Sequence, residues 1–191
     1  VPGCYGQPFE QVTCLPGRLE QPLRWRKPRH IFVNSMGDLF HQDVPDEFLD
    51  SVFAVMALCP QHTFMVLTKR PEAMREYLAQ RSGAEWRDHL ANVAREDFGS
   101  DVAECRVANA IGGCLAAPMN VGWPMRNLWL GVTAENQEQA DARIPVLLDT
   151  PAALCFVSVE PMLGPVDLGR WIGTHNCHLC YPMTGASGER F

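Results

Sequence analysis

The chain has 191 residues, of which 47% are hydrophobic and 20% charged, and its formal net charge is −6. This composition is typical of a folded globular protein with a sizeable core and excludes a disordered chain. The negative charge argues against a protein that coats nucleic acid non-specifically. No apolar run approaches the ~20 residues of a membrane helix, and no signal peptide opens the sequence. We therefore expect a single domain, residues 1–191, in the cytoplasm and without a membrane partner.

A basic segment lies at the end of the N-terminal approach, residues 1–29, just before the first predicted strand. Its four cations surround Trp25 and are Arg24, Arg26, Lys27 and Arg29. Two interpretations stay open. The arginine stems can lie over Trp25 as part of a solvated surface. Alternatively, the segment binds nucleic acid, although a phosphate-binding surface usually carries more charge.

Four short apolar runs predict buried strands at residues 31–34, 63–68, 128–133 and 155–159. The runs are nearly continuous rather than alternating, which is typical of strands covered on both faces of a parallel sheet. Helical spacing follows in residues 45–59, where Pro45 suits the first helical position, and again from Pro71. Further helices are predicted in residues 85–96 and 135–150, and Pro145 should kink or restart the last one. This alternation predicts an α/β fold with a parallel sheet and flanking helices.

Three regions give weaker signals. Residues 98–124 are rich in Gly and Ala and are predicted to be an insertion or long loop. Residues 170–191 read as an irregular tail, in which Cys177 and Cys180 with the flanking His175 and His178 could supply four zinc ligands only at unfavourably close spacing. We expect no metal site there. Four histidines have no local carboxylate or cysteine at metal-ligand spacing and are expected to be structural or exposed: His30, His41, His62 and His89.

Polar side chains follow each predicted strand at the point where the strand ends. Because the carboxyl ends of parallel strands meet at one edge of a sheet, where ligands bind in such folds, these side chains should converge. We call this edge the strand-end rim and predict that it binds a nucleotide-like or anionic ligand. Its members are Asn34, Ser35, Asp38, Thr68, Lys69, Arg70, Thr133, Glu135, Asn136, Ser158 and Glu160.

Lys69 and Arg70 are the most suggestive part of the rim, because they stand between a strand end and the helix that starts at Pro71. Cations beside helix-terminal amides favour a phosphate or carboxylate. The alternative is that one of them pairs with Glu72 or Glu160 and only holds the rim together. Glu160 has the same two interpretations, acid–base chemistry or a structural salt bridge. The standard catalytic signatures are missing from the sequence, so no residue is assigned a catalytic role.

Four long blocks, in this order, resemble a family of phage and bacterial proteins of unknown function. They are PLRWRKPRHIFVNSMGDLFHQDVPDEF, HTFMVLTKRPEAM, WPMRNLWLGVTAEN and CFVSVEPMLGPVDL, and they span most of residues 18–168. The resemblance implies a TIM-barrel-like fold similar to that of radical S-adenosylmethionine enzymes. It also implies that full-length members begin with a cysteine cluster. The predicted fold therefore becomes a partial TIM-barrel-like sheet.

The chain looks truncated at both ends relative to this family pattern. Only Cys4 lies where the implied cluster would end, and an iron–sulfur cubane needs three closely spaced thiolates. We therefore expect an iron–sulfur cluster and S-adenosylmethionine in full-length relatives but neither in this chain. The turn at residues 185–188 has Ala186 where the family pattern has an acid. The chain is also shorter than the ~250 residues of a complete eight-stranded barrel.

Two functions stay open at this point. The first is an enzyme-like partial barrel whose rim binds a nucleotide-like or anionic ligand. The second is a non-catalytic phage accessory protein that uses the rim or the basic segment to bind a protein or nucleic-acid partner.

Overall fold

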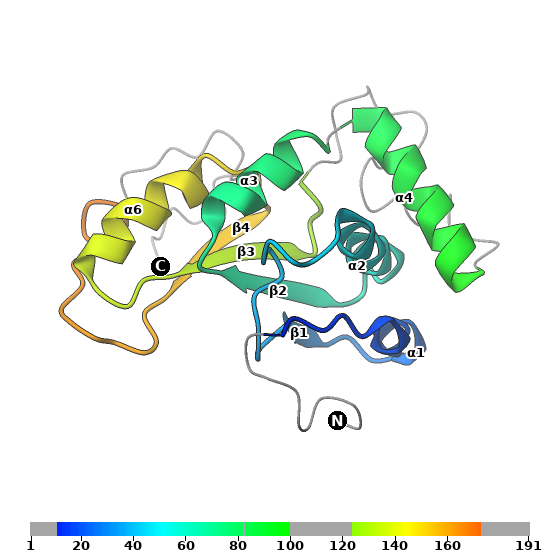
Figure 1. Ribbon diagram of the computed structural model, residues 1–191, viewed down its shortest axis with the longest axis horizontal. Coiled ribbons are helices and arrows are strands. Elements are labelled where there is room, and N and C mark those ends of the chain that lie inside the picture. The colour runs from blue at the N-terminus through cyan, green and yellow to red at the C-terminus, as the bar shows by residue number, and fades with distance from the viewer. Residues whose placement is uncertain (1–10, 82, 100–123, 173–191) are drawn as a thin grey trace, which may run out of the picture.

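A computed structural model describes residues 11–81, 83–99 and 124–172, and Figure 1 shows how their helices and strands are arranged. Four parallel strands form one sheet: β1 (His30–Val33), β2 (Thr63–Thr68), β3 (Leu128–Thr133) and β4 (Leu154–Ser158). Their order in the sheet is β1-β2-β3-β4. Each strand lies within one residue of its predicted ends. The α/β fold with a parallel sheet is confirmed.

The described helices are η1 (Pro16–Arg18), α1 (Gln21–Arg24), α2 (Asp46–Leu58), α3 (Pro71–Ala79), α4 (Gly83–Phe98) and α6 (Gln137–Leu148). Pro45 is the N-cap of α2, with an extended backbone, rather than its first helical residue. Helix α6 continues through Pro145 to Leu148 and does not restart there. Pro145 stands in the last turn, so its missing N–H leaves few of the helix's hydrogen bonds unformed.

The core lies between one face of the sheet and the helices that connect the strands. Figure 1 shows α2, α3 and α6 over this face. The strand residues that point to it stand in register across the sheet, for example Val33, Val66, Leu130 and Cys155. Buried helix residues meet them, including Phe53 of α2, Met74 of α3 and Ile144 of α6. Each fully buried side chain of this size contributes about 1.5–3 kcal/mol to stability.

The opposite face of the sheet is apolar but less covered, and we call it the open face. Its side chains are those of Phe32, Met65, Leu67, Trp129, Leu154 and Phe156, which alternate along the strands with the core residues. Phe32 is 45% exposed and Leu154 is 37% exposed. The sequential strand order explains the difference between the faces. Each right-handed crossover moves one strand further in the same direction, so successive helices stay on one side.

Several predictions fall on residues outside the described ranges. These are most of the predicted insertion, residues 100–123, and most of the predicted tail, residues 173–191, with Cys177, Cys180 and the turn at 185–188. Cys4 also lies outside the described ranges. Organisation as a single domain stays a prediction. Among the described helices, none combines the length and the apolar character needed to cross a bilayer.

Candidate functional site

Asp38 is the centre of one hydrogen-bond network at the strand-end rim. Its Oδ1 accepts hydrogen bonds from the Thr68 hydroxyl at 2.7 Å and from the Phe40 N–H at 3.1 Å. Its Oδ2 accepts from the Lys69 N–H at 3.0 Å and from the Arg70 guanidinium at 2.9 Å. With four donors around it, the carboxylate fixes the end of β2 relative to the loop after β1. Asp38 therefore positions Lys69 through its backbone and Arg70 through its side chain.

Thr68 links this network to the start of α3. Its hydroxyl donates to Asp38 and also accepts a hydrogen bond from the Arg70 N–H at 2.9 Å. The backbone turns sharply here, because Thr68 ends β2 and Pro71 begins α3. The N-cap residue of α3, Arg70, makes no capping hydrogen bond with its own side chain. The positive end of that helix thus lies directly beside Lys69 and Arg70.

Glu135 is the centre of a second network, formed at the end of β3. Its carboxylate lies 2.9 Å from the Lys69 ammonium and 2.7 Å from the Arg143 guanidinium of α6. Arg143 also donates to the Thr133 carbonyl at 2.7 Å. Lys69 therefore joins the ends of β2 and β3. Its side chain remains 50% exposed, while that of Glu135 is only 11% exposed.

The environment of Glu135 stabilises its charged form. Burial raises the pKa of Glu135, but the Lys69 hydrogen bond and the Arg143 charge outweigh that effect. The net result is a pKa below the ordinary value of a glutamate. Glu135 is therefore a fixed negative charge at neutral pH, and it holds two cations in place.

The structure corrects the predicted partners of Lys69 and Arg70. Sequence spacing suggested Glu72 or Glu160, but Lys69 pairs with Glu135 and Arg70 pairs with Asp38. Glu160 is exposed and makes no hydrogen bond or ion pair with the residues that the structure describes. The predicted salt bridge from Glu160 to either cation is wrong.

The other rim residues have mainly local roles. Asn136 caps α6 by accepting a hydrogen bond from the Gln139 N–H at 3.0 Å. Asn34 has a φ of 60° and begins the turn after β1, in a conformation that asparagine tolerates better than most residues. Ser35 is exposed on that turn. The Ser158 carbonyl accepts from the Ala134 N–H at 2.8 Å, which extends the pairing of β3 and β4.

Arg143 is the rim residue that sequence reasoning missed. It lies on α6, two turns after Glu135, and its side chain is 14% exposed. A cation eight residues beyond a strand end gives no local signal, because only the folding of α6 back over β3 brings it to Glu135. Its nearest sequence clue was its position between the buried residues Ala140 and Ile144.

A buried ionic cluster lies away from the rim, between α2, α3 and α4. Asp50 accepts hydrogen bonds from the Tyr77 hydroxyl at 2.6 Å and from the Arg81 Nε at 3.1 Å. The Nε2 atom of His89 lies 2.8 Å from the same carboxylate. Arg81 also bridges to Asp46 at 2.7 Å and stacks on the Tyr77 ring. These contacts fix the three helices relative to one another.

His89 was expected to be structural or exposed because the sequence gave it no local carboxylate or cysteine partner at metal-ligand spacing. Its carboxylate partner is Asp50, 39 residues away, so only the packing of α4 on α2 reveals the pair. Burial raises the pKa of Asp50, but the hydrogen bonds from Tyr77 and His89 and the charge of Arg81 lower it by more than burial raises it. The pKa of Asp50 is therefore below its ordinary value. Burial and the neighbouring Asp50 raise the pKa of Tyr77, which stays neutral.

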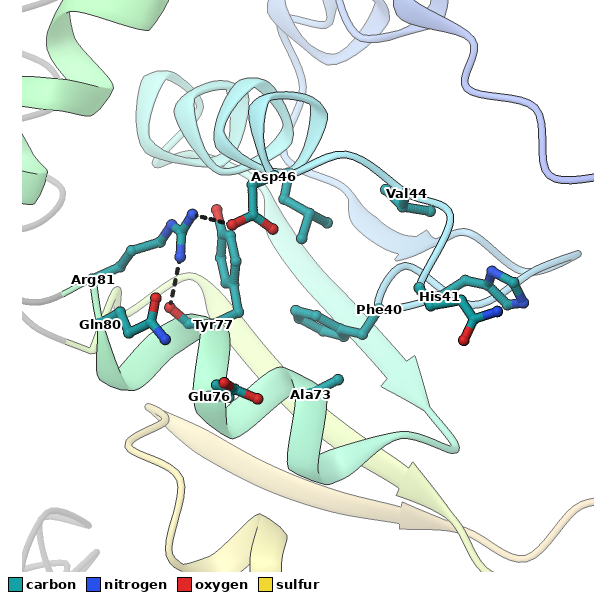
Figure 2. A pocket seen from close by; sticks show the side chains of 11 residues that line it. Phe40, His41, Val44, Asp46, Ala73, Glu76, Tyr77, Gln80 and Arg81 are labelled. Carbon is teal, nitrogen blue, oxygen red and sulfur yellow. Dashed lines mark hydrogen bonds and ion pairs between the residues drawn. The ribbon is translucent and has the colours of Figure 1, made fainter.

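A pocket of about 250 Å³ lies between this cluster and the loop after β1, as Figure 2 shows. The Phe40 and Tyr77 rings form part of its wall, and Arg81 stands at one end, bonded to Asp46. None of the eleven predicted rim residues lines this pocket. The Arg81 guanidinium is already paired with the carboxylates of Asp46 and Asp50, so the pocket offers little free charge to a ligand.

The basic segment is partly engaged within the chain. Arg24 pairs with Glu20 at 2.5 Å, and the Arg29 guanidinium stacks over the Trp25 ring at 4.5 Å from its centroid. This is the interpretation in which arginine side chains lie over Trp25. Trp25 in turn contacts the buried ring of His62. Arg26 and Lys27 are exposed.

The comparisons with known proteins agree with the uncharacterised family suggested by the sequence blocks. The model of the family described as "Protein of unknown function (DUF5131)" matches residues 4–187. The chain belongs to this family. Every rim residue of this DUF5131 member lies within the matched range. No curated protein and no solved structure matches the chain.

The described part of this DUF5131 chain contains no group of three or more His, Cys, Asp or Glu side chains that could hold a metal ion. The Asp38 and Glu135 carboxylates face Lys69, Arg70 and Arg143 instead of one another. This arrangement holds the cations in place at the carboxyl edge of the sheet. Lys69 and Arg70 stay partly exposed there, as does the Glu160 side chain.

Proposed function

We propose that the strand-end rim binds an anionic, nucleotide-like small molecule. The observation that carries this proposal is the placement of Lys69 and Arg70. Glu135 pairs with the Lys69 side chain and Asp38 pairs with that of Arg70. Both cations remain partly exposed, 50% for Lys69 and 43% for Arg70. They stand side by side at the N-terminus of α3. Cations and a helix N-terminus at the carboxyl edge of a parallel sheet favour a phosphate or carboxylate.

The charge balance of the ion-paired network within the rim supports an anionic ligand. In this network Lys69, Arg70 and Arg143 carry three positive charges and Asp38 and Glu135 carry two negative charges, which leaves one positive charge. Glu160, the third carboxylate of the rim, is exposed and lies outside the network. Since the chain as a whole has a formal charge of −6, the rim is locally different from the rest of the molecule. A ligand phosphate would add contacts to the exposed sides of the two cations without displacing their carboxylate partners.

The finer part of the proposal is that the chain is one of a group of phage and bacterial proteins whose domain is built on a barrel plan similar to that of radical S-adenosylmethionine enzymes. Four parallel strands in sequential order, with their connecting helices on one face, support it, because this is the order of a (β/α) barrel. Ligands bind at the carboxyl ends of the strands in such barrels. The adenosyl group of S-adenosylmethionine is then one candidate for the nucleotide-like part.

The test uses the fact that the chain has two lysines, Lys27 and Lys69. Isothermal titration with S-adenosylmethionine, ATP and inorganic phosphate measures the dissociation constant of each compound. We expect at least one to bind to the wild type, and Lys69→Met to weaken it tenfold or more. Lys27→Met is the matched control and should bind as the wild type does. Equal binding by both variants, or no binding of any compound, contradicts the proposal.

A spectroscopic version of the same test identifies the contact directly. Reductive methylation with ¹³C-formaldehyde gives NMR signals for the two lysines and the chain N-terminus. The Lys69→Met and Lys27→Met variants assign these signals. A bound anion should shift the Lys69 signal and leave the Lys27 signal in place. A shift of the Lys27 signal alone would place the ligand on the basic segment and support the alternative function.

A further inference from the structure

Exposed cations precede two strands of the sheet, β1 and β3. We call them the amino-end cations, and they are Arg26, Lys27, Arg29 and Arg126. Because parallel strands all begin at the same edge of a sheet, the four lie at the end opposite the strand-end rim. The side chains of Arg26, Lys27 and Arg126 make no hydrogen bond or ion pair with the residues that the structure describes. They are therefore available to an anionic partner.

Backbone hydrogen bonds bring the two cationic segments to the same strand. The Thr63 N–H donates to the Arg29 carbonyl at 2.9 Å, and the Phe64 N–H donates to the Asn127 carbonyl at 2.7 Å. Thr63 and Phe64 are the first two residues of β2, so the segments before β1 and β3 flank its start from either side. Neighbouring strands lie about 4.8 Å apart, which places the two segments about 10 Å from each other.

Both segments are also anchored close to the C-terminal end of α2. The Asn127 side chain donates hydrogen bonds to the Met56 carbonyl at 2.9 Å and to the Cys59 carbonyl at 3.2 Å. The Nε2 atom of His62, just before β2, lies 3.1 Å from the carbonyl oxygen of Pro22 in α1. The backbone around the amino-end cations is thus fixed before a partner binds, which reduces the entropy lost on binding.

Carboxylates are scarce in the described segments just before the four strands. These segments are residues 24–29, 59–62, 124–127 and 149–153, and Asp149 is their single acid. Asp149 precedes β4, the strand furthest from β1, and its carboxylate lies 3.8 Å from the Arg75 guanidinium. Among the described residues, cations therefore predominate at this end of the sheet, although the chain has a formal charge of −6. The basic segment alone carries few charges for phosphate binding, and folding adds Arg126 to it.

Arg29 differs from the other three cations because it is stacked. Its guanidinium lies over the Trp25 ring, 4.5 Å from the centroid. The His62 ring meets the Trp25 ring edge-on, with centroids 6.0 Å apart, and so supports it. Arg29 itself is exposed. Because unpaired bases stack on guanidinium planes as they do on aromatic rings, Arg29 offers a place for one base.

From these observations we propose that the amino end of the sheet binds single-stranded nucleic acid. Arg26, Lys27 and Arg126 contact phosphates of the strand, and one base stacks on Arg29. A duplex keeps the faces of its bases stacked inside, and an acidic peptide has no base, so neither would use the stacked guanidinium. The proposal does not depend on the ligand of the strand-end rim, which lies at the other end of the strands.

The first test measures binding of a fluorescein-labelled oligothymidylate by fluorescence anisotropy at several salt concentrations. With three phosphate contacts, the logarithm of the association constant should fall against the logarithm of salt concentration with a slope of about −2. Lys27→Gln and Arg126→Gln should each weaken binding about threefold or more at about 50 mM salt, and each should reduce the slope by about 0.7. Circular dichroism checks that the variants stay folded.

Arg18→Gln is the matched control, because it removes the same charge from another exposed arginine of the N-terminal approach. Gly17 and Leu19, its neighbours, line a pocket together with Phe48 of the first turn of α2. Arg18 is therefore close to the start of α2, whereas the amino-end cations lie near its other end. The Arg18→Gln variant should bind the oligothymidylate as the wild type does.

A second test separates stacking from charge. Arg29→Lys keeps the positive charge but removes the planar group. It should weaken binding of the oligothymidylate about fivefold or more and leave the salt slope unchanged. An abasic strand of the same length offers phosphates without bases. The wild type and Arg29→Lys should therefore bind the abasic strand equally.

Four results would overturn the proposal. The first is the absence of oligothymidylate binding at about 50 mM salt. The second is an equal loss of binding in Arg18→Gln, which would show that only net charge matters. The third is tighter binding of a duplex or of a polyglutamate peptide than of the single strand. The fourth is a loss in Arg29→Lys that is as large with the abasic strand. Lys69→Met should keep its affinity for the strand, so this variant separates failure here from failure of the rim proposal.

Discussion

Lys69 is held at the rim by a single side-chain ion pair, and half of its surface faces solvent. Glu135, its partner, is nearly buried but also bonded to Arg143 at 2.7 Å. Removing the lysine therefore does not leave a buried carboxylate without a cation. This arrangement separates two roles of the rim charges. Arg143 is placed to stabilise the fold, and Lys69 is the cation that we propose contacts a ligand.

The first prediction follows from this difference. Lys69→Met should change the free energy of unfolding by less than about 1 kcal/mol, since exposed ion pairs contribute little. Glu160→Gln should be equally mild, because Glu160 has no partner among the described residues. Arg143→Met should cost about 2–3 kcal/mol, because it removes buried hydrogen bonds to Glu135 and to the Thr133 carbonyl. Urea denaturation of the three variants measures these values. Equal losses for Lys69→Met and Arg143→Met would show that the rim is mainly structural.

The Asp50 cluster allows a second prediction at the same scale. Asp50→Ala should reduce the free energy of unfolding by about 3 kcal/mol, because it leaves the Tyr77 hydroxyl and the Arg81 guanidinium without their carboxylate. His89→Gln is the matched control, since the His89 side chain is 50% exposed and should cost far less. Guanidinium or urea titration gives both values. A loss for His89→Gln as large as that for Asp50→Ala would contradict this account of the cluster.

Between elements, β3 and β4 are fitted to one another on the open face by a glycine and an aromatic ring. Gly131 pairs with Phe156 in the register of the two strands. The three nearest atoms to a Cβ at position 131 all belong to that ring, at 2.5 to 2.7 Å. The close approach, rather than an unusual backbone angle, is what requires glycine here.

The third prediction tests this fit. Gly131→Ala should destabilise the protein by about 1–3 kcal/mol, because the new methyl group overlaps the Phe156 ring and forces it to move. Phe156→Leu in the same chain should recover part of that loss by vacating the space. Thermal and urea unfolding of both single variants and the double variant give the coupling energy. Additive losses would mean that Phe156 is not what excludes a side chain at position 131.

At the scale of the whole molecule, two described carboxylates with lowered pKa values contribute to how stability depends on pH. Asp50 and Glu135 both have pKa values below their ordinary ones in the folded state. A depressed folded pKa contributes stability that is fully present above the unfolded pKa, about 4 for these groups. That contribution is lost as the pH falls through the lower folded value. The two sites lie in different parts of the fold, so their effects should add.

The fourth prediction is an acid limb of stability that these two groups produce. The free energy of unfolding should fall as the pH drops below about 4, and the double variant Asp50→Asn/Glu135→Gln should fall less steeply. The comparison uses the slope of the unfolding free energy against pH rather than its absolute value, because the substitutions also remove stabilising contacts. Urea midpoints at several pH values between about 3 and 6 provide the slope. An unchanged slope in the double variant would assign the acid limb to other carboxylates.

The sequence by itself determined the strands, most helices and the edge at which polar residues gather. Apolar runs such as residues 63–68 form strands because they bury every second side chain in the core and leave apolar side chains on the open face. Pro71 begins α3 because its ring suits the first turn of a helix. These signals are local. Strand–helix alternation then leaves few topologies, so Asp38, Lys69 and Glu135 could be assigned to one rim before any contact was known.

Only the tertiary structure decided which of these residues are partners. Lys69 pairs with Glu135 and not with Glu72 or Glu160, and Asp50 meets His89 across 39 positions of sequence. Arg143 reaches the rim because α6 folds back over β3. The physical reason is that an ion pair forms over a few ångströms in space, and crossovers of different lengths bring distant side chains to that distance. The spacing of two residues along the chain does not indicate this distance in space.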